Sequence, residues 1–307
     1  MLDRDAAPGL DPDDRPIEIH GPHAEAERIV QRGSPARLAL RLAVAVAVLA
    51  AGAGSMLRAR LWYAERLARR APMVHIPGGP VRIGSDHGPP EERPEHEVVL
   101  RPFDIDLTEV TVAAYAACAQ RGPCTAPRRG DFCNWGKQSL DDHPINCVDH
   151  AQASAYCAWA GKRLPTEKEW EHAARGGDGR LYPWGDGAPS ADRLNACGIE
   201  CRAYGAEHGR SWPAMHERDD GFPLTAPVGS FPAGQSPYGL FDLEGNVREW
   251  TSSPHCPYPE ERCGNEIEHV IRGVGFSHHL VSNVEITTRE ALPKTEALET
   301  LGFRCAR

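Results

Sequence analysis

The sequence predicts one large domain of short strands, short helices and many turns, preceded by a hydrophobic segment and a polar tail. Three observations support this prediction. Glycine (30) and proline (27) are abundant among the 307 residues, which favours turns over long regular elements. All ten cysteines lie between Cys118 and Cys305. An apolar run occupies Leu42–Leu57. The length suits one full hydrophobic core plus a tail.

The first 36 residues are polar. They are rich in Asp, Arg, Pro and Ala and show no hydrophobic period. Such a segment buries too little apolar surface to fold. We therefore predict a disordered tail over residues 1–36.

The apolar run Leu42–Leu57 is short for a bilayer, which needs about 20 apolar residues. If the side chain of Arg41 reaches the interface, the run extends back to Leu38 and becomes long enough. We favour a transmembrane signal anchor over residues 37–58, because the run is far from Met1. Two alternatives stay open: a signal peptide cleaved near residues 51–55, and a buried alanine-rich helix.

The segment that follows, residues 59–72, has a basic helical pattern in which Leu61, Trp62 and Leu67 alternate with arginines. A helix of this kind lies on a membrane surface or serves as a solvated linker, and both interpretations stay open.

The cysteines indicate the compartment. Arginines flank both ends of the apolar run, so the positive-inside rule gives no orientation. An even number of cysteines in a loop-rich domain indicates disulfides formed under oxidising conditions, as in the bacterial periplasm. Zinc sites are the alternative, but no two cysteines have Cys-x-x-Cys spacing. We therefore expect the domain outside the cytoplasm and the tail inside it.

The formal net charge of −9 argues against nucleic acid as a partner, because phosphate recognition needs a basic surface.

The domain begins at Met73 with strand patterns. Residues 73–79 predict a strand that ends in a turn, and residues 81–100 predict two short strands around a charged, proline-rich loop. Alternation over residues 101–111 continues as a half-buried strand. We therefore expect four consecutive strands at the start of the domain.

Three helices with capping signals are expected after these strands. Thr111 is the expected N-cap of the first, and the second spans about Asp149 to Ala160. The third has a capping box of Thr166 and Glu169 and runs to Gly176.

A set of ordered motifs then identifies a family. The string AYCAWAGKRLPTEKEWEHAARGGDGRLYPWG covers residues 155–185. It is followed by the Asn195-Ala196 pair, DDGF at residues 219–222, TAPVGSFPAGQSPYGLFDLEGNVREWTSS from Thr225, IRG at residues 271–273, and LGFRCA from Leu301. These motifs resemble the formylglycine-generating enzyme (sulfatase-modifying factor) family, and the match extends over residues 73–307. The resemblance implies a single α+β domain related to the C-type-lectin fold, with little regular secondary structure.

The resemblance also implies one disulfide, between Cys157 and Cys305. The other eight cysteines are paired by proximity in the sequence, which does not by itself fix connectivity. The expected additional pairs are Cys118–Cys124, Cys133–Cys147, Cys197–Cys201 and Cys256–Cys263.

Two structural calcium sites are implied by the resemblance. The first set of ligands is Asn195, the Ala196 carbonyl, Asp220 and the Phe222 carbonyl. The second set is Asp242, the Gly245 and Val247 carbonyls, and Glu249. Carboxylates with backbone oxygens between them suit a hard cation. The alternative is that these acidic residues cap turns through local hydrogen bonds.

The copper site of the family's enzymes is missing. Those enzymes use two cysteines after a Gly-Gly-Ser segment, and soft thiolates select copper(I). The corresponding positions fall near His278 and Asn283, and no cysteine lies between Cys263 and Cys305. Adjacent histidines on a strand point in opposite directions, so His278 and His279 are not expected to replace the pair. Copper is therefore not expected as a cofactor.

Two classes of function follow. The favoured one is a non-catalytic, membrane-anchored extracytoplasmic module. It would bind a peptide, protein or glycan in the groove where the family's enzymes hold substrate, lined near Arg248, His278 and Asn283. Arg248 would favour an anionic group. The alternative is a divergent oxidase that converts a sulfatase cysteine to formylglycine.

Overall fold

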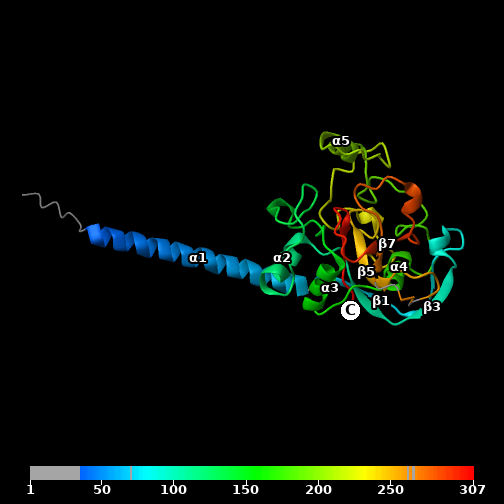
Figure 1. Ribbon diagram of the computed structural model, residues 1–307, viewed down its shortest axis with the longest axis horizontal. Coiled ribbons are helices and arrows are strands. Elements are labelled where there is room, and N and C mark those ends of the chain that lie inside the picture. Colours follow the sequence, from blue (N-terminus) through cyan, green and yellow to red (C-terminus); the bar gives the residue numbers. More distant parts are fainter. Residues whose placement is uncertain (1–34, 70, 261–262, 265–266) are drawn as a thin grey trace, which may run out of the picture. The chain divides into compact units, whose positions relative to one another are not determined.

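The computed structural model describes residues 35–69, 71–260, 263–264 and 267–307 (Figure 1). The chain divides into two compact units, Met1–Gly54 and Ser55–Arg307. All but the last two residues of the predicted disordered tail, 1–36, lie outside the described residues.

Helix α1 (Pro35–Arg69) covers the predicted anchor and most of the predicted basic segment. Across the described residues, however, no helix is long and apolar enough to cross a membrane. The run Leu42–Leu57 is rich in alanine and glycine, which contribute little hydrophobicity. The prediction that residues 37–58 span a membrane is therefore not supported, although a helix is present there.

The domain begins with the four predicted strands, which form two antiparallel pairs. Strand β1 (Met73–Ile76) pairs with β4 (Phe103–Asp106), and β2 (Gly79–Ile83) pairs with β3 (His96–Leu100). Strands β1, β2 and β4 turn isoleucines to the interior, since Ile76, Ile83 and Ile105 have no exposed surface, whereas Val99 of β3 is 78% exposed. The strand prediction for residues 73–106 is confirmed.

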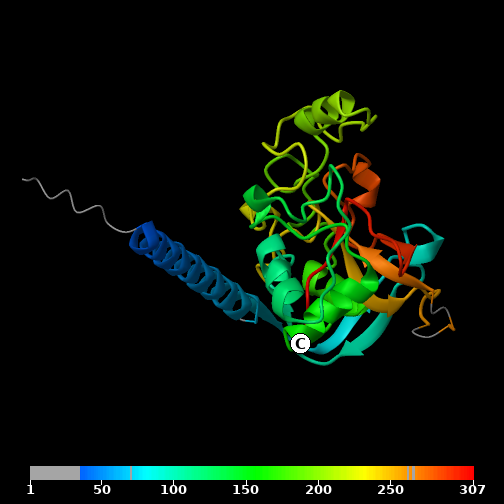
Figure 2. The same ribbon diagram turned by 60° about the vertical axis from the view of Figure 1, so that its left-hand side comes forward.

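A four-stranded sheet forms the centre of the domain. Its order is β7 (Arg289–Pro293), β6 (Glu268–Arg272), β5 (Arg248–Pro254) and β8 (Leu301–Gly302). The β7–β6 and β6–β5 pairs are antiparallel and β5–β8 is parallel. Figure 2 shows this sheet from a second direction. The pairing of β5 with β8 places the C-terminal segment beside Arg248, the first residue of β5.

Three helices begin at the expected caps. Helix α2 (Val112–Arg121) has Thr111 as its N-cap, and α3 (His150–Trp159) starts with a capping box at Asp149. Helix α4 (Glu167–Arg175) has the predicted box of Thr166 and Glu169 and ends at Gly176, whose φ of 67° favours glycine. The prediction of these helices is confirmed.

The core lies between the helices and the central sheet. Trp250 of β5 anchors one buried cluster together with residues of α2 and α3. Trp170 of α4 anchors a second cluster, which includes residues of β1 and β4. Both indoles are fully buried. Helix α5 (Ile199–Glu207) lies at the periphery of the domain in both views (Figures 1 and 2).

Five disulfides fasten the domain, and they use all ten cysteines of the sequence. The pair that the resemblance implied joins α3 to the C-terminal segment and closes a separation of 148 residues. The remaining pairs are those expected from proximity. The five disulfides are Cys118–Cys124, Cys133–Cys147, Cys157–Cys305, Cys197–Cys201 and Cys256–Cys263.

Candidate functional site

The positions that correspond to the family's copper-binding cysteines lie on the connection between β6 and β7. Within this connection His278 follows a turn, because its amide donates to the Gly275 carbonyl at 2.9 Å. Asn283 ends a short 3-10 helix, Val281–Asn283. Since every cysteine is in a disulfide, no thiol is available to this connection.

Arg248 lies at the start of β5 and is already engaged by the protein. Its Nη1 contacts Glu290 Oε2 at 2.6 Å, and its Nη2 donates to Thr300 Oγ1 at 3.1 Å. The Arg248 side chain is 19% exposed and that of Glu290 is 43% exposed. An anionic ligand at Arg248 must therefore compete with an internal carboxylate.

His278 lies within electrostatic range of the Arg248–Glu290 pair. Burial lowers the pKa of His278, Glu290 raises it and Arg248 lowers it. The His278 Nε2 atom is 3.1 Å from the Leu280 carbonyl oxygen, so the ring is held by the local turn. The Asn283 side chain accepts a hydrogen bond from Ser282. The structure thus places His278 within electrostatic range of Arg248, while Asn283 is engaged within its own short helix.

The first predicted calcium set is assembled beside α5. Asp220 Oδ1 accepts from the Phe222 amide at 2.9 Å, and the Ala196 amide also donates to this carboxylate. The Asn195 Nδ2 group donates to the Leu224 carbonyl at 2.9 Å. Its Oδ1 atom and Asp220 Oδ2 are buried without a hydrogen-bond partner among the described residues. Two oxygens of the predicted set are therefore available to a cation.

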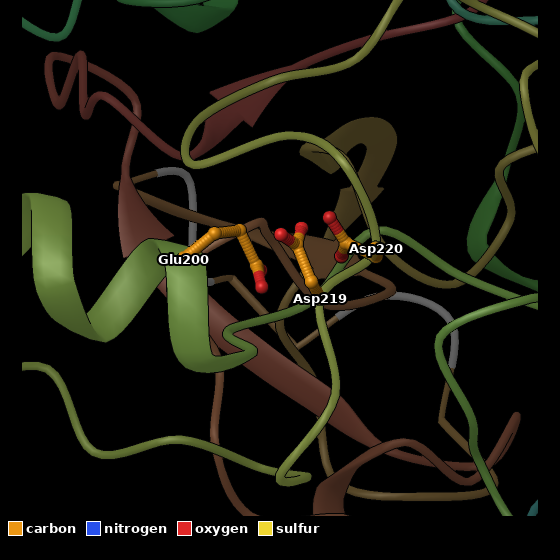
Figure 3. Close-up of side chains that lie close together, drawn as sticks. All are labelled: Glu200, Asp219 and Asp220. Atoms are coloured by element: carbon orange, nitrogen blue, oxygen red, sulfur yellow. The ribbon is translucent and has the colours of Figure 1, made fainter.

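Two further acidic side chains complete this cluster (Figure 3). One oxygen each from Glu200, Asp219 and Asp220 lie within 4.8 Å of one another. Glu200 Oε2 is also buried without a partner in the described part of the chain. The donor set is made of oxygens only, which suits a calcium ion. Desolvation, the largest cause, raises the pKa of Asp220 to about 7, and Glu200 adds to this effect.

The sequence analysis missed Glu200 and Asp219. A signal for Asp219 existed, because it immediately precedes a predicted ligand. Glu200 lies in the first turn of α5, inside the short loop that Cys197 and Cys201 close. That disulfide holds the first turn of α5 close to the chain after Asn195. The approach of this loop to Asp219 and Asp220 is a tertiary contact without a local sequence signature.

The two carboxylates of the second predicted calcium set are bonded by the protein itself. Both oxygens of Glu249 accept from Arg304, at 2.7–2.9 Å, and Glu249 Oε2 also accepts from Trp170 Nε1 at 2.9 Å. Asp242 Oδ2 accepts from the Gly229 amide at 2.6 Å. A guanidinium therefore occupies the position in which Glu249 would meet a cation, and the sequence pattern could not show this because Arg304 is 55 residues away.

Val247, another member of this set, and the neighbouring Asn246 bond a buried carboxyl group that the sequence did not single out. Glu109 accepts from the Val247 amide at 3.1 Å and from Asn246 Nδ2 at 2.9 Å. Gly245 has a φ of 95°, and a Cβ atom there would lie 2.8 Å from the Asn195 carbonyl oxygen. Burial raises the pKa of Glu109 well above its ordinary value. These groups shape the turn before β5.

The fold and these motifs define a class of protein. Residues 61–307 match the family described as sulfatase-modifying factor enzyme 1-like domain, and the chain belongs to this family, which includes the formylglycine-generating enzymes. It is 32% identical over 283 residues to the mouse protein named inactive C-alpha-formylglycine-generating enzyme 2, covering 76% of this chain and 85% of that protein. It is 33% identical over 288 residues to the formylglycine-generating enzyme of Streptomyces coelicolor, covering 76% and 88%.

Other relatives differ in their named activity. The chain is 33% identical over 220 residues to hercynine oxygenase of Mycolicibacterium smegmatis, covering 61% of this chain and 46% of that protein. Among solved structures, PvdO from Pseudomonas aeruginosa is similar with a TM-score of 0.58 and 28% identity, covering 76% of this chain and 93% of PvdO. CarF is similar with a TM-score of 0.53 and 19% identity, covering 77% of this chain and 98% of CarF. At this identity the likeness shows the shared fold alone.

Proposed function

We propose that this protein is a non-catalytic, extracytoplasmic member of the family that binds a peptide, protein or glycan. The observation that carries the proposal is that the five disulfides use all ten cysteines. A copper(I) site of the family's kind needs two free thiolates. At the corresponding positions, His278 and Asn283 offer one imidazole and one amide, which are harder donors than thiolates.

The relatives are compatible with this proposal. The family contains a protein named as inactive, to which the chain is 32% identical over 283 residues. It also contains enzymes with about the same identity, so identity alone does not decide between binding and catalysis. The residues at the site support binding, because activity depends on the ligand set and not on the fold.

The catalytic half of the proposal is tested with a sulfatase-type Cys-x-Pro-x-Arg peptide. The full chain is incubated with this peptide, copper(I) and oxygen, and the cysteine is analysed by mass spectrometry and with an aldehyde-reactive probe. We expect no formylglycine, whereas the Streptomyces coelicolor enzyme should produce it under the same conditions. Formylglycine above a no-protein control would overturn the proposal.

A matched variant tests whether the cysteines of one disulfide could supply the missing thiols. Reduction of the Cys256–Cys263 disulfide would supply two thiols to a nearby metal. Cys256→Ser/Cys263→Ser removes both, and we expect the same absence of product from this variant and from the native chain. Product from the native chain alone would assign catalysis to these two cysteines.

The binding half rests on the surface beside β5. Arg248 lies at the start of β5 and contacts Glu290 and Thr300, and its side chain is partly exposed. An incoming carboxylate can replace Glu290 as the partner of Arg248 with the same charge and geometry. The test is a pull-down from an envelope extract with the native chain and with Arg248→Gln. A specific partner that the variant fails to retain supports the proposal. Equal retention by both would remove Arg248 from the binding surface.

The extracytoplasmic location rests on the disulfides, because such bonds form and persist in oxidising compartments. Protease added to intact cells or spheroplasts should digest the domain, and thiol alkylation without reductant should modify no cysteine. A protected domain with alkylated cysteines would contradict the location.

A structural calcium ion at the first predicted site completes the proposal. Asn195 and Asp220 would hold the ion, with Glu200 and Asp219 as additional donors. Asn195, Asp220 and Glu200 each offer a buried oxygen without a partner among the described residues, and one oxygen of Asp219 lies within 4.8 Å of Glu200 and Asp220. The ion would fix the loop before α5 against residues 219–222. It would have no part in chemistry at Arg248.

A further inference from the structure

A second surface feature lies on the side of the domain where the chain leaves α2. Eight residues line a cleft of about 350 Å³: Arg128, Arg129, Gly130, Asp131, Phe132, Cys133, Arg210 and Glu299. The loop that supplies most of them is fixed at both ends, by the Cys118–Cys124 disulfide before it and the Cys133–Cys147 disulfide after it. The cleft is therefore pre-organised, which reduces the entropy that a ligand must overcome.

The charge of this cleft contrasts with that of the chain. Three arginines line it in a protein of net charge −9. Glu299 lies between two of them, with its carboxylate 3.9 Å from Arg128 and 3.6 Å from Arg210. Both separations exceed hydrogen-bond length, so one carboxylate is shared loosely by two guanidinium groups. Asp131 is the other acidic residue of the lining, which leaves an excess of positive charge.

The guanidinium groups are open to a ligand. The side chain of Arg128 is 58% exposed and that of Arg210 is 46% exposed. Arg210 lies over the ring of Phe132, with 5.0 Å between Cζ and the ring centroid. Stacking of this kind orients the plane of the guanidinium while its N–H groups stay free to donate at the edge.

The cleft is joined to the Arg248 surface by one short segment. Glu299 lines the cleft, and the next residue, Thr300, accepts a hydrogen bond from Arg248. Guanidinium groups therefore approach both Glu299 and Thr300.

We propose that the Arg128–Arg210 cleft binds an acidic peptide segment, with its carboxylates replacing Glu299 between the two arginines. This inference rests on the proposed binding function and names the class of its partner. Clusters of arginines recognise acidic motifs by bidentate, charge-assisted hydrogen bonds. A peptide fits better than a glycan, because the one aromatic ring in the lining, Phe132, is buried beneath Arg210 and leaves no open face for a sugar.

The test measures binding of a fluorescein-labelled oligoglutamate peptide to the full chain by fluorescence anisotropy, with oligoglutamine as the uncharged control. We expect binding that weakens as salt is added. Arg210→Gln and Arg128→Gln should each weaken it about tenfold or more, the loss of one charge-assisted contact. Glu299→Gln should tighten binding, because it removes the internal competitor and keeps the shape of the side chain.

Arg202→Gln is the matched control. Arg202 is as exposed as Arg210 (48%) but pairs with Glu217 outside the cleft. It should leave the affinity unchanged, so a loss confined to the cleft variants excludes a general effect of net charge. Three outcomes would each overturn the inference. Oligoglutamine could bind as tightly as oligoglutamate, all three arginine variants could lose equal affinity, or a sulfated oligosaccharide could bind where oligoglutamate does not. If the pull-down yields a partner while oligoglutamate fails to bind, the acidic-peptide inference fails and the proposed function stands.

Discussion

Arg304 and Glu249 form a fully buried ion pair in which the guanidinium donates to both carboxylate oxygens at 2.7–2.9 Å. The pair joins the C-terminal segment to strand β5. Arg304 also donates to the carbonyls of Phe241 and Asp242. The side chain that the sequence pattern assigned to a calcium site therefore serves to attach the end of the chain to the central sheet.

Breaking this pair should be strongly destabilising. Arg304→Met leaves the Glu249 carboxylate buried without its cation, which costs about 3–5 kcal/mol. Urea unfolding of the native chain and the variant measures the difference in free energy. Arg202→Gln, which breaks an exposed pair, should leave the stability nearly unchanged. Similar losses in the two variants would show that the buried pair has no special weight.

The long-range disulfide should contribute more than the short ones. Cys157 and Cys305 are separated by 148 residues, and the chain-entropy relation gives about 5 kcal/mol for closing such a loop. For the six-residue separation of Cys118 and Cys124 it gives about 2 kcal/mol. For each disulfide, both cysteines are replaced by alanine, and denaturant unfolding measures the loss in the free energy of unfolding. The larger loss is expected for the Cys157–Cys305 variant. An equal loss from both would contradict the entropic account for this protein.

Calcium should stabilise the fold through the first site alone. A ligand that binds only the folded state contributes about 2.7 kcal/mol at a hundredfold excess over its dissociation constant, so a chelator should lower the melting temperature. Asp220→Asn should remove most of this response. Glu249→Gln should retain it, because Glu249 is held by Arg304. A melting curve unaffected by chelator would reduce Asp220 and Glu200 to turn-capping roles.

Acid should destabilise the protein through His269. This residue of β6 is 7% exposed, and its ring lies 4.2 Å from that of His150. Desolvation, the largest cause, lowers the pKa of His269 from 6.5 to about 4, and His150 and Lys294 add to the effect. Between these two pH values, His269 therefore stays neutral in the folded state but is protonated in the unfolded chain. The stability contribution of neutral His269 is complete above pH 6.5 and is lost as the pH falls towards 4.

Urea unfolding of the native chain at about pH 7.5 and about pH 5 measures this loss. His269→Gln cannot titrate and should lose less stability than the native chain over the same interval. Asp149 carries the opposite charge near His150 and raises the pKa of that histidine, so its substitution should steepen the dependence. An identical pH profile for the native chain and His269→Gln would assign the acid response to other groups.

Much of this protein could be predicted from local sequence. The caps at Thr111, Asp149 and Thr166 act on amides three residues further along the chain, so the pattern and the contact coincide. The first strands follow from alternation for the same reason. The family motifs identified the domain, and one of them implied the Cys157–Cys305 disulfide. The apolar run at Leu42–Leu57 is helical, and among the described residues no helix is long and apolar enough to cross a membrane.

The tertiary structure decided which polar groups are available. Glu249 and Arg248 each look free in the sequence, yet Arg304 occupies the first and Glu290 the second. Conversely, Glu200 is drawn to Asp220 by the closed loop of α5. An ion pair between residues tens of positions apart depends on the tertiary fold that brings the two residues into contact, and no short-range sequence pattern encodes that contact. The sequence alone determined the family, the capped helices and the absence of a thiol pair near His278. Folding determined which carboxylates and guanidiniums remain for a ligand, because a buried charge is satisfied by an opposite charge that lies near it in space.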